Sequence, residues 1–389
     1  QIQKTKYNQV TNKPTPPNLL VPKISLDKMG FNLANSLVGK IAVSLVGCHL
    51  LLTCNTSHAI TSSSHASFIP ISTSQNIRGA ARSEFSTGLI IKAVQTPTLE
   101  SLGEDLGQSK FQNVVVVMGA GASVSAGIPD FRTPGTGLYD SLSKYNLPFP
   151  EAMFDLEYYT TVNAQPFVDL SSTLWPGQDS GPHPTITHAF LKVLQDRGVL
   201  RRVYTQNIDG LEALAGVDTE KLVECHGHFR SASCTKCQKP VASIESCMET
   251  ILNKQIPSCD HCGGLVKPDV VFFGEALPRR FSQVIEKDME DCDLLIVIGT
   301  SLLVMPVSRI PQWVDRTCPR LLLNREKVGD FGRVLKASEK AGGGLFIRDV
   351  VAQGDCDDGV QKLCHLIGWK DDLDEAYSFA ANRHFRDQI

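Results

Sequence analysis

Short runs of apolar residues recur along the chain from about residue 114 onward, and most are followed by Gly or by polar residues. These runs cover residues 114–118, 203–204, 270–273, 294–298 and 321–323. Continuous apolar runs are typical of strands that are buried on both faces, as in a parallel sheet. Residues 188–194 and 281–289, which lie between runs, have helical spacing. The alternation predicts an α/β fold with a doubly wound, Rossmann-like parallel sheet.

Two segments interrupt this alternation, and we expect them to form a smaller lobe. Residues from about 141 to 198 place aromatic residues and prolines between short helical patterns, which predicts a helical insert. Residues 230–265 hold two Cys-x-x-Cys pairs and predict a zinc ribbon. The Rossmann-like core then comprises about 105–140, 199–229 and 266–370, within a folded domain over 96–370. Residues 371–389 are expected to form a C-terminal tail.

The first 95 residues differ from the rest in composition. Residues 1–83 contain eight basic residues and one acidic residue, for a net charge of +7, whereas the remainder contains 30 basic and 40 acidic residues, for −10. A basic, acid-poor and Ser-rich segment is typical of a transit peptide. Its arginine content is low for that type, so an ordinary disordered tail is the alternative. We therefore expect 1–95 to be a disordered leader that directs the protein to the mitochondrial matrix, with cytoplasm or nucleus as the other possibility.

Charge and length also exclude two classes of partner. The acidic body argues against nucleic acid as a direct partner, because phosphate binding needs a basic surface. The most apolar early stretch, residues 41–54, is too short for a membrane span, which needs roughly twenty residues. We expect neither nucleic-acid binding nor a membrane span.

Small or polar residues follow four of the predicted strands. The first strand continues into Gly119, Ala120, Gly121, Ala122 and Ser123, where small residues would let backbone N–H groups approach a phosphate. On its own this loop is as compatible with a tight turn, and the dehydrogenase fingerprint is incomplete because Val124 holds the third glycine's place. The other strand ends carry residues 206–209, 299–301 and 324–325. Since ligands bind beyond the carboxyl ends of such strands, the four together predict a dinucleotide site.

His226 and four cysteines are the other candidates for site chemistry. A neutral imidazole is well suited to accept a proton near pH 7, so His226 is a candidate general base, with His228 as its rival. The cysteines read Cys234-x₂-Cys237-x₂₁-Cys259-x₂-Cys262. This spacing predicts one tetrahedral four-thiolate zinc ion per chain. All four ligand positions are filled, which makes the metal structural.

Taken together, these segments resemble the sirtuin family of NAD-dependent protein lysine deacylases, and most closely its mitochondrial class I deacetylase, with the cytosolic relative as near rival. The resemblance runs from about residue 99 to 369. It rests on GAGASVSAGIPDFR (119–132), TQNIDGLE (205–212), His226-Gly227, the cysteine pairs, KPDVVFFGE (267–275), GTSL (299–302) and LLLNRE (321–326).

The resemblance implies a role for each matching residue. His226 would be the catalytic base, while Asn207 and Asp209 would hold the ribose and a water molecule. Acylated-lysine proteins would bind at Val270, Val271, Phe272, Phe273, Gly274 and Glu275, pairing as a strand. NAD would be bound by Gly119, Ala120, Gly121, Ala122, Ser123, Asp130, Phe131, Arg132, Tyr139, Gln206, Asn207, Ile208, Asp209, Gly299, Thr300, Ser301, Asn324, Arg325, Glu326 and Cys356.

The implied reaction consumes NAD as a co-substrate. The acyl oxygen attacks C1′ of the ribose as nicotinamide leaves, and water completes the transfer to give free lysine and 2′-O-acyl-ADP-ribose. Ala122, Cys225, His228 and Leu303 depart from the family pattern and leave the peptide preference open. Two alternatives remain: a protein mono-ADP-ribosyltransferase, or a catalytically inactive zinc-ribbon module that senses NAD.

Overall fold

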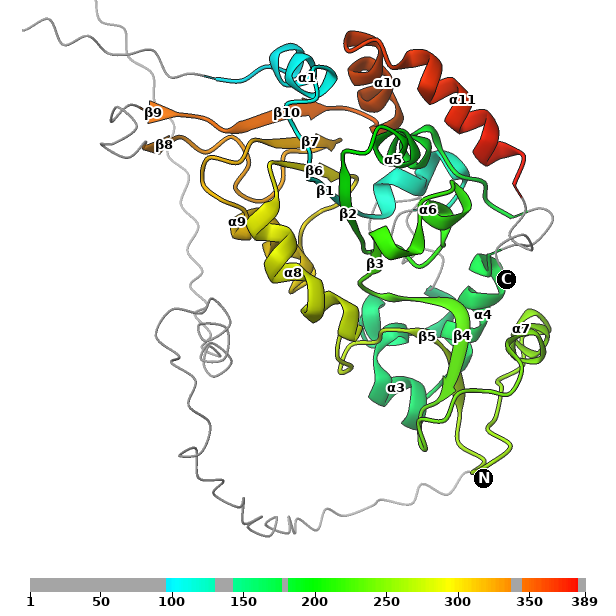
Figure 1. Ribbon diagram of the computed structural model, residues 1–389. Helices are drawn as coiled ribbons and strands as arrows, with labels where there is room; N and C mark the ends of the chain where they lie inside the picture. Colours follow the sequence, from blue (N-terminus) through cyan, green and yellow to red (C-terminus); the bar gives the residue numbers. More distant parts are fainter. Residues whose placement is uncertain (1–95, 130–142, 177–180, 337–344, 384–389) are drawn as a thin grey trace, which may run out of the picture. The chain divides into compact units, whose positions relative to one another are not determined.

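The computed structural model describes residues 96–129, 143–176, 181–336 and 345–383, and their central feature is a six-stranded parallel sheet (Figure 1). Its strand order is β10-β7-β6-β1-β2-β3. The strands are β1 (Val114–Met118), β2 (Leu200–Thr205), β3 (Leu222–Glu224), β6 (Leu294–Ile298), β7 (Arg320–Asn324) and β10 (Asp349–Gln353). The chain builds the sheet outward from β1 in one direction and then, from β6, in the other. The reversal beside β1 is the place where doubly wound sheets bind ligands.

The central strands are apolar throughout because both faces of the sheet are covered. Along β1, Val114, Val116 and Met118 pack into one core, whereas Val115 and Val117 pack into the other. Helices α1 (Leu99–Gly107), α5 (Ile186–Asp196), α10 (Cys356–Leu366) and α11 (Lys370–Ala381) cover the first face. Helices α8 (Arg279–Asp291) and α9 (Ile310–Trp313) cover the second (Figure 1). The predicted doubly wound sheet is confirmed.

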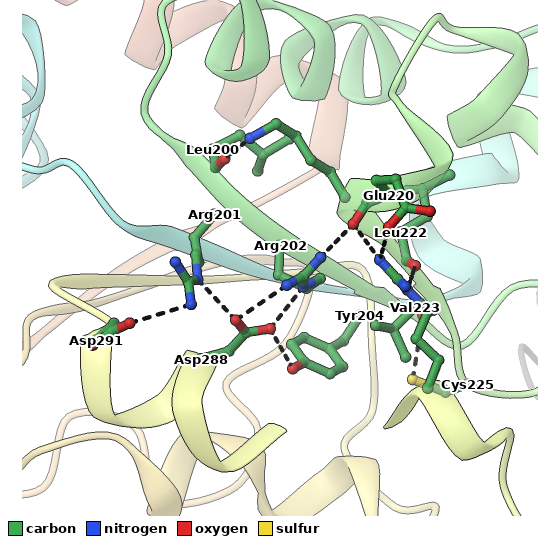
Figure 2. Close-up of polar contacts among 12 residues, drawn as sticks. Leu200, Arg201, Arg202, Tyr204, Glu220, Leu222, Val223, Cys225, Asp288 and Asp291 are labelled. Carbon is green, nitrogen blue, oxygen red and sulfur yellow. Dashed lines mark hydrogen bonds and ion pairs between the residues drawn. The ribbon is translucent and has the colours of Figure 1, made fainter. Parts of the chain in front are cut away.

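A buried carboxylate fastens α8 to the sheet. Asp288 on α8 accepts hydrogen bonds from Arg201 Nε at 2.8 Å, Arg202 Nε at 2.7 Å and the Tyr204 hydroxyl at 2.8 Å, all on β2 (Figure 2). Arg201 also pairs with Asp291 at 3.2 Å. Burial raises the pKa of Asp288, but the hydrogen bonds from Arg202 and Tyr204 outweigh this and leave that pKa below its usual value. Asp288 is therefore ionised and paired at neutral pH.

The smaller lobe is built on an antiparallel pair, β4 (Gly227–Cys234) with β5 (Val266–Val270). Helices α3 (Leu156–Thr161), α4 (Gln165–Leu174) and α7 (Ile244–Leu252) belong to it. An edge-to-face aromatic cluster lies at its centre, where the rings of Phe167 and Phe272 are 4.6 Å apart and Tyr159 contacts both. The lobe thus has a core of its own beside that of the sheet.

Short elements complete the described chain. Helix α6 (Leu211–Leu214) follows β2, and β8 (Leu335–Lys336) pairs with β9 (Leu345–Phe346). The 3₁₀ helices are η2 (Ala120–Ala126), η3 (Ser143–Tyr145), η4 (Pro150–Phe154), η5 (Thr219–Lys221) and η6 (Val307–Arg309). None of the described helices combines the length and apolarity needed to cross a membrane.

Three details differ from the sequence predictions. The expected parallel strand over 270–273 is wrong, because β5 ends at Val270, is antiparallel, and is followed by Phe272 turned into the aromatic cluster. Helix α5 falls within the predicted insert, yet it packs on the central sheet. The predicted tail contains most of α11, whose Leu373 and Ala376 are buried in the same core. The predicted leader, 1–95, lies outside the described residues.

Candidate active site

A cavity of about 610 Å³ lies beyond the carboxyl ends of β1, β2, β6 and β7. The small lobe contributes His226 and all of residues 270–275 to its wall. The structure therefore brings the predicted peptide residues and thirteen of the twenty predicted cofactor residues to one cavity. The lining residues from the predicted cofactor set are Gly119, Ala120, Gly121, Gln206, Asn207, Ile208, Gly299, Thr300, Ser301, Asn324, Arg325, Glu326 and Cys356.

Three other members of that set lie in the described part of the chain but are not among the lining residues. These are Ala122, Ser123 and Asp209, whose side chains are buried. Asp130, Phe131, Arg132 and Tyr139 lie outside the described residues.

The loops after β1 and β6 approach each other so closely that only glycine fits. A Cβ atom on Gly121 would lie 2.7 Å from the Gly299 Cα, and one on Gly299 would lie 2.5 Å from the Ala122 nitrogen. Gly299 also has a φ of +60°, which disfavours other residues. The Gly121 N–H donates to the Gly299 carbonyl at 2.8 Å. The small residues that suggested a phosphate loop thus also permit this contact between two strand ends.

A buried hydrogen-bond chain positions the polar residues after β2. Asn207 Nδ2 donates to Ser123 Oγ at 3.1 Å and to the Gly119 carbonyl at 3.3 Å. The Ser123 hydroxyl in turn donates to Asp209 Oδ2 at 2.8 Å. Because Asn207 makes both of these bonds through its side-chain nitrogen, its Oδ1 atom is the acceptor left for a ligand. Asp209 therefore orients Asn207, which lines the cavity, through the hydroxyl of Ser123.

The base candidate His226 lies between β3 and β4, with one ring nitrogen engaged. Its Nδ1 is 2.9 Å from the Gln206 carbonyl oxygen, which can only accept, so Nδ1 carries the proton. Nε2 then bears the lone pair, and it has no hydrogen-bond partner among the described residues. Burial lowers the pKa of His226, although the bond to Gln206 opposes this. His226 is therefore a neutral base at pH 7.

The neighbouring glycine and the rival histidine have different roles. A Cβ atom on Gly227, whose φ is +80°, would lie 2.0 Å from the Asp269 carbonyl oxygen, so the His-Gly pair is required by the close packing of β4 on β5. The side chain of His228 does not belong to the described cavity lining. Burial lowers the pKa of His228, and the nearby positive charge of Arg230 lowers it further. Geometry thus separates two histidines that the sequence left as alternatives.

Residues 270–275, which are predicted to bind the peptide, are held in place by a buried lysine that the sequence analysis did not single out. Lys267 Nζ donates to the Val270 carbonyl at 2.6 Å and pairs with Glu275 at 2.9 Å. The same carboxylate accepts the Phe272 N–H at 2.8 Å. The available signal was the place of Lys267 at the start of the KPDVVFFGE motif, directly before the apolar run 270–273. These bonds close residues 270–275 into a fixed turn.

The four cysteines form the predicted metal site. Their sulfur atoms lie within 4.8 Å of one another, with Cys234–Cys262 at 3.5 Å and Cys237–Cys259 at 3.8 Å. Tetrahedral zinc with bonds of about 2.3 Å sets sulfur atoms about 3.8 Å apart, so the cluster fits the ion. A Cβ atom on Gly264 would come within 3.0 Å of the Cys234 sulfur, which explains a glycine there. The cluster is a structural zinc site, and none of its four cysteines lines the cavity.

Fold and site together define a nucleotide-binding α/β protein with an attached zinc ribbon and a partly buried histidine. The family described as "Sir2 family" matches residues 119–306. The chain is 46% identical over 294 residues to the NAD-dependent protein deacetylase sirtuin-2 of Danio rerio, covering 73% of this chain and 76% of that protein. This protein belongs to the Sir2 family.

Two further relatives give similar values. The NAD-dependent protein deacetylase hst2 of Schizosaccharomyces pombe is 44% identical, covering 71% of this chain and 78% of the relative. The NAD-dependent protein deacetylase sirtuin-3 of Mus musculus is 43% identical, with coverage of 71% and 78%. The three identities span only three percentage points, and the family is what they establish.

Proposed function

We infer that this protein is an NAD-dependent protein lysine deacetylase whose cavity holds NAD and an acetylated lysine together. The observation that carries the inference is His226, a neutral base whose free Nε2 stands in the wall shared by the strand-end loops and the peptide segment. A dehydrogenase needs no such base beside a peptide-binding segment. A deacetylase does, because its second step removes a proton from a ribose hydroxyl.

The loops after the four strands would bind NAD. Backbone groups of residues 119–121 and 299–301 would face the phosphates and ribose, with Asn207 Oδ1 accepting from a ribose hydroxyl. Residues 324–326 and Cys356, at the far strand β7 and the start of α10, would flank the adenosine half. Asp209 would keep Asn207 oriented through Ser123 rather than touch the ribose itself.

The acetylated lysine would enter beside residues 270–275. Four of the five amides in residues 271–275 already donate within the chain: Val271 to the His226 carbonyl, Phe272 to the Glu275 carboxylate, Phe273 to Phe154, and Glu275 to Phe272. Gly274, with a φ of +96°, offers the remaining N–H. Strand pairing with the substrate would therefore use the Gly274 amide and main-chain carbonyls, which bind any sequence.

The reaction that membership of the Sir2 family implies fits this arrangement. The acetyl oxygen attacks C1′ of the ribose and the bond to nicotinamide breaks, with its electrons leaving on nicotinamide. His226 Nε2 takes a proton from the ribose hydroxyls, so that the 2′-oxygen attacks the imidate carbon. Water adds, the lysine amine leaves, and 2′-O-acetyl-ADP-ribose is formed. Burial around His226 keeps bulk water from capturing C1′ first.

Nicotinamide release tests the proposal. We expect the wild-type protein to release nicotinamide from NAD only when an acetyl-lysine peptide is present, and His226→Ala to lower kcat by about 10²- to 10⁴-fold. His228→Ala is the matched control and should retain activity. Equal loss in both variants would contradict the role of His226. Labelled ADP-ribose on protein, without peptide deacetylation, would favour mono-ADP-ribosyl transfer instead.

We also propose that residues 1–95 deliver the enzyme to the mitochondrial matrix. The support is their composition, with a net charge of +7 over residues 1–83 and no acidic residue between Lys28 and Ser83. A fusion of residues 1–95 to a fluorescent protein should be imported into mitochondria, and a fusion of residues 96–389 should not. Diffuse cytoplasmic fluorescence of the first fusion would refute this proposal and leave the enzymatic one intact.

A further inference from the structure

Three large apolar side chains are exposed at the wall of the active-site cavity. Phe273 is 47% exposed, Leu303 66% and Met305 57%, and all three line the cavity that holds His226. Ten large hydrophobic residues are exposed in the described parts of the chain, so three of ten gather at this one place. Such a gathering around a cavity indicates a surface that a ligand covers.

The two segments that carry these side chains contribute almost no charge. The two segments that carry the apolar residues, 271–275 and 301–305, contain a single charged residue, Glu275. Its carboxylate is paired with Lys267 at 2.9 Å and accepts the Phe272 N–H. A charged substrate side chain placed here would lose hydration without gaining a partner from either segment.

We propose that the preferred substrates carry a large apolar side chain immediately beside the acetylated lysine. This inference rests on the proposed deacetylase function, because an acetyl-lysine that reaches toward His226 places its sequence neighbours at the cavity wall. A Leu, Met or Phe side chain in that position would cover Phe273, Leu303 and Met305. Lys, Arg, Asp or Glu would not. Main-chain bonding alone would show no such preference, so these three side chains supply the specificity.

Peptides that differ at one position test this preference. Acetyl-lysine peptides with Leu, Ala, Lys or Glu directly after the modified lysine, and a second set varied directly before it, are assayed at saturating NAD. We expect KM for the best Leu peptide to be roughly tenfold lower than for its Lys and Glu counterparts, with kcat little changed, because partial burial of one apolar side chain has about this effect.

Substitutions in the wall should change the preference in a defined direction. In Leu303→Glu and Met305→Glu, we expect KM for the Leu peptide to rise and KM for the Lys peptide to fall. Val162→Glu is the matched control, because Val162 is 67% exposed and is not part of the cavity lining. It should leave the order of peptides as in the wild type.

The outcomes separate this inference from the function on which it rests. Equal kcat/KM for all peptides, or wall variants that keep the wild-type order, would refute the apolar preference while the deacetylase assignment stands. Failure to deacetylate any peptide would refute the proposed function and the preference with it.

Discussion

Glu212 offers a sharp test of how charge is organised behind the cavity. It is only 1% exposed, and its carboxylate lies within 4.8 Å of both His188 and Asp209, which are also buried. Burial, followed by the negative charge of Asp209, raises the pKa of Glu212 to about 8. At neutral pH Glu212 is therefore protonated in the folded protein.

The sign of the pH dependence follows from linkage. The ordinary pKa of 4.5 applies to the unfolded chain, so between pH 4.5 and about 8 the folded protein binds one more proton than the unfolded one. Stability contributed by this group is full below 4.5 and is lost as pH rises to about 8. The raised pKa of Glu212 corresponds to a change of at most about 5 kcal/mol in the free energy of unfolding, at about 1.4 kcal/mol per pKa unit. Between pH 6 and 8 the expected loss is about 2 kcal/mol.

Glu212→Gln removes the titrating group while keeping its shape. Urea unfolding of the zinc-loaded proteins at pH 6, 7 and 8 gives the free energy of unfolding of each. Groups common to both proteins cancel in the difference, so the wild type should lose about 2 kcal/mol relative to Glu212→Gln across this range. A difference that stays constant from pH 6 to 8 would show that Glu212 is already ionised in the fold, and would refute the reasoning.

Three further predictions concern the scaffold. Asp288→Ala should lower the free energy of unfolding by about 3–5 kcal/mol, because it leaves Arg201 and Arg202 without their shared carboxylate. Asp288→Asn should lower it less. Denaturant unfolding measures both variants, and equal effects would contradict the importance of the charge. Gly121→Ala should raise KM for NAD on the order of 100-fold, since a Cβ atom would lie 2.7 Å from the Gly299 Cα and displace the loop after β1. An unchanged KM would show that the loops after β1 and β6 can separate freely. Strong chelation should release one zinc ion per chain and abolish activity, because the zinc ribbon connects β4 to β5. The control variant, His261→Ala, should keep its zinc. Metal-free protein that is still active would overturn the structural role of the zinc.

The sequence was sufficient to predict those segments whose residue types are set by a single requirement, such as burial on both faces or metal binding. The runs 114–118 and 294–298 are apolar at every position because both faces of the sheet are covered, and they form β1 and β6. The strand ends carry small or polar residues because backbone and ligand must approach there. The spacing of the four cysteines is set by metal geometry, which is local to the chain.

The parts of the fold and site that the sequence did not predict depend on contacts between distant segments. Strand β3 has only three residues, and β10 mixes polar with apolar positions, so neither produces a clear pattern. Phe272 belongs to a strand-like run, yet its ring is drawn into the aromatic cluster of the small lobe. Glu212 lies in a short helix that alone would leave it in water. Its burial against His188 arises only when α5 packs beside the strand ends.

Product analysis tests the central claim most directly. Wild-type protein, NAD and an acetyl-lysine peptide are incubated together, and the products are quantified by mass spectrometry. The account predicts nicotinamide, deacetylated peptide and 2′-O-acetyl-ADP-ribose in a 1:1:1 ratio, with none formed when NAD is omitted. Free acetate released without NAD consumption, or NADH as the product, would contradict it.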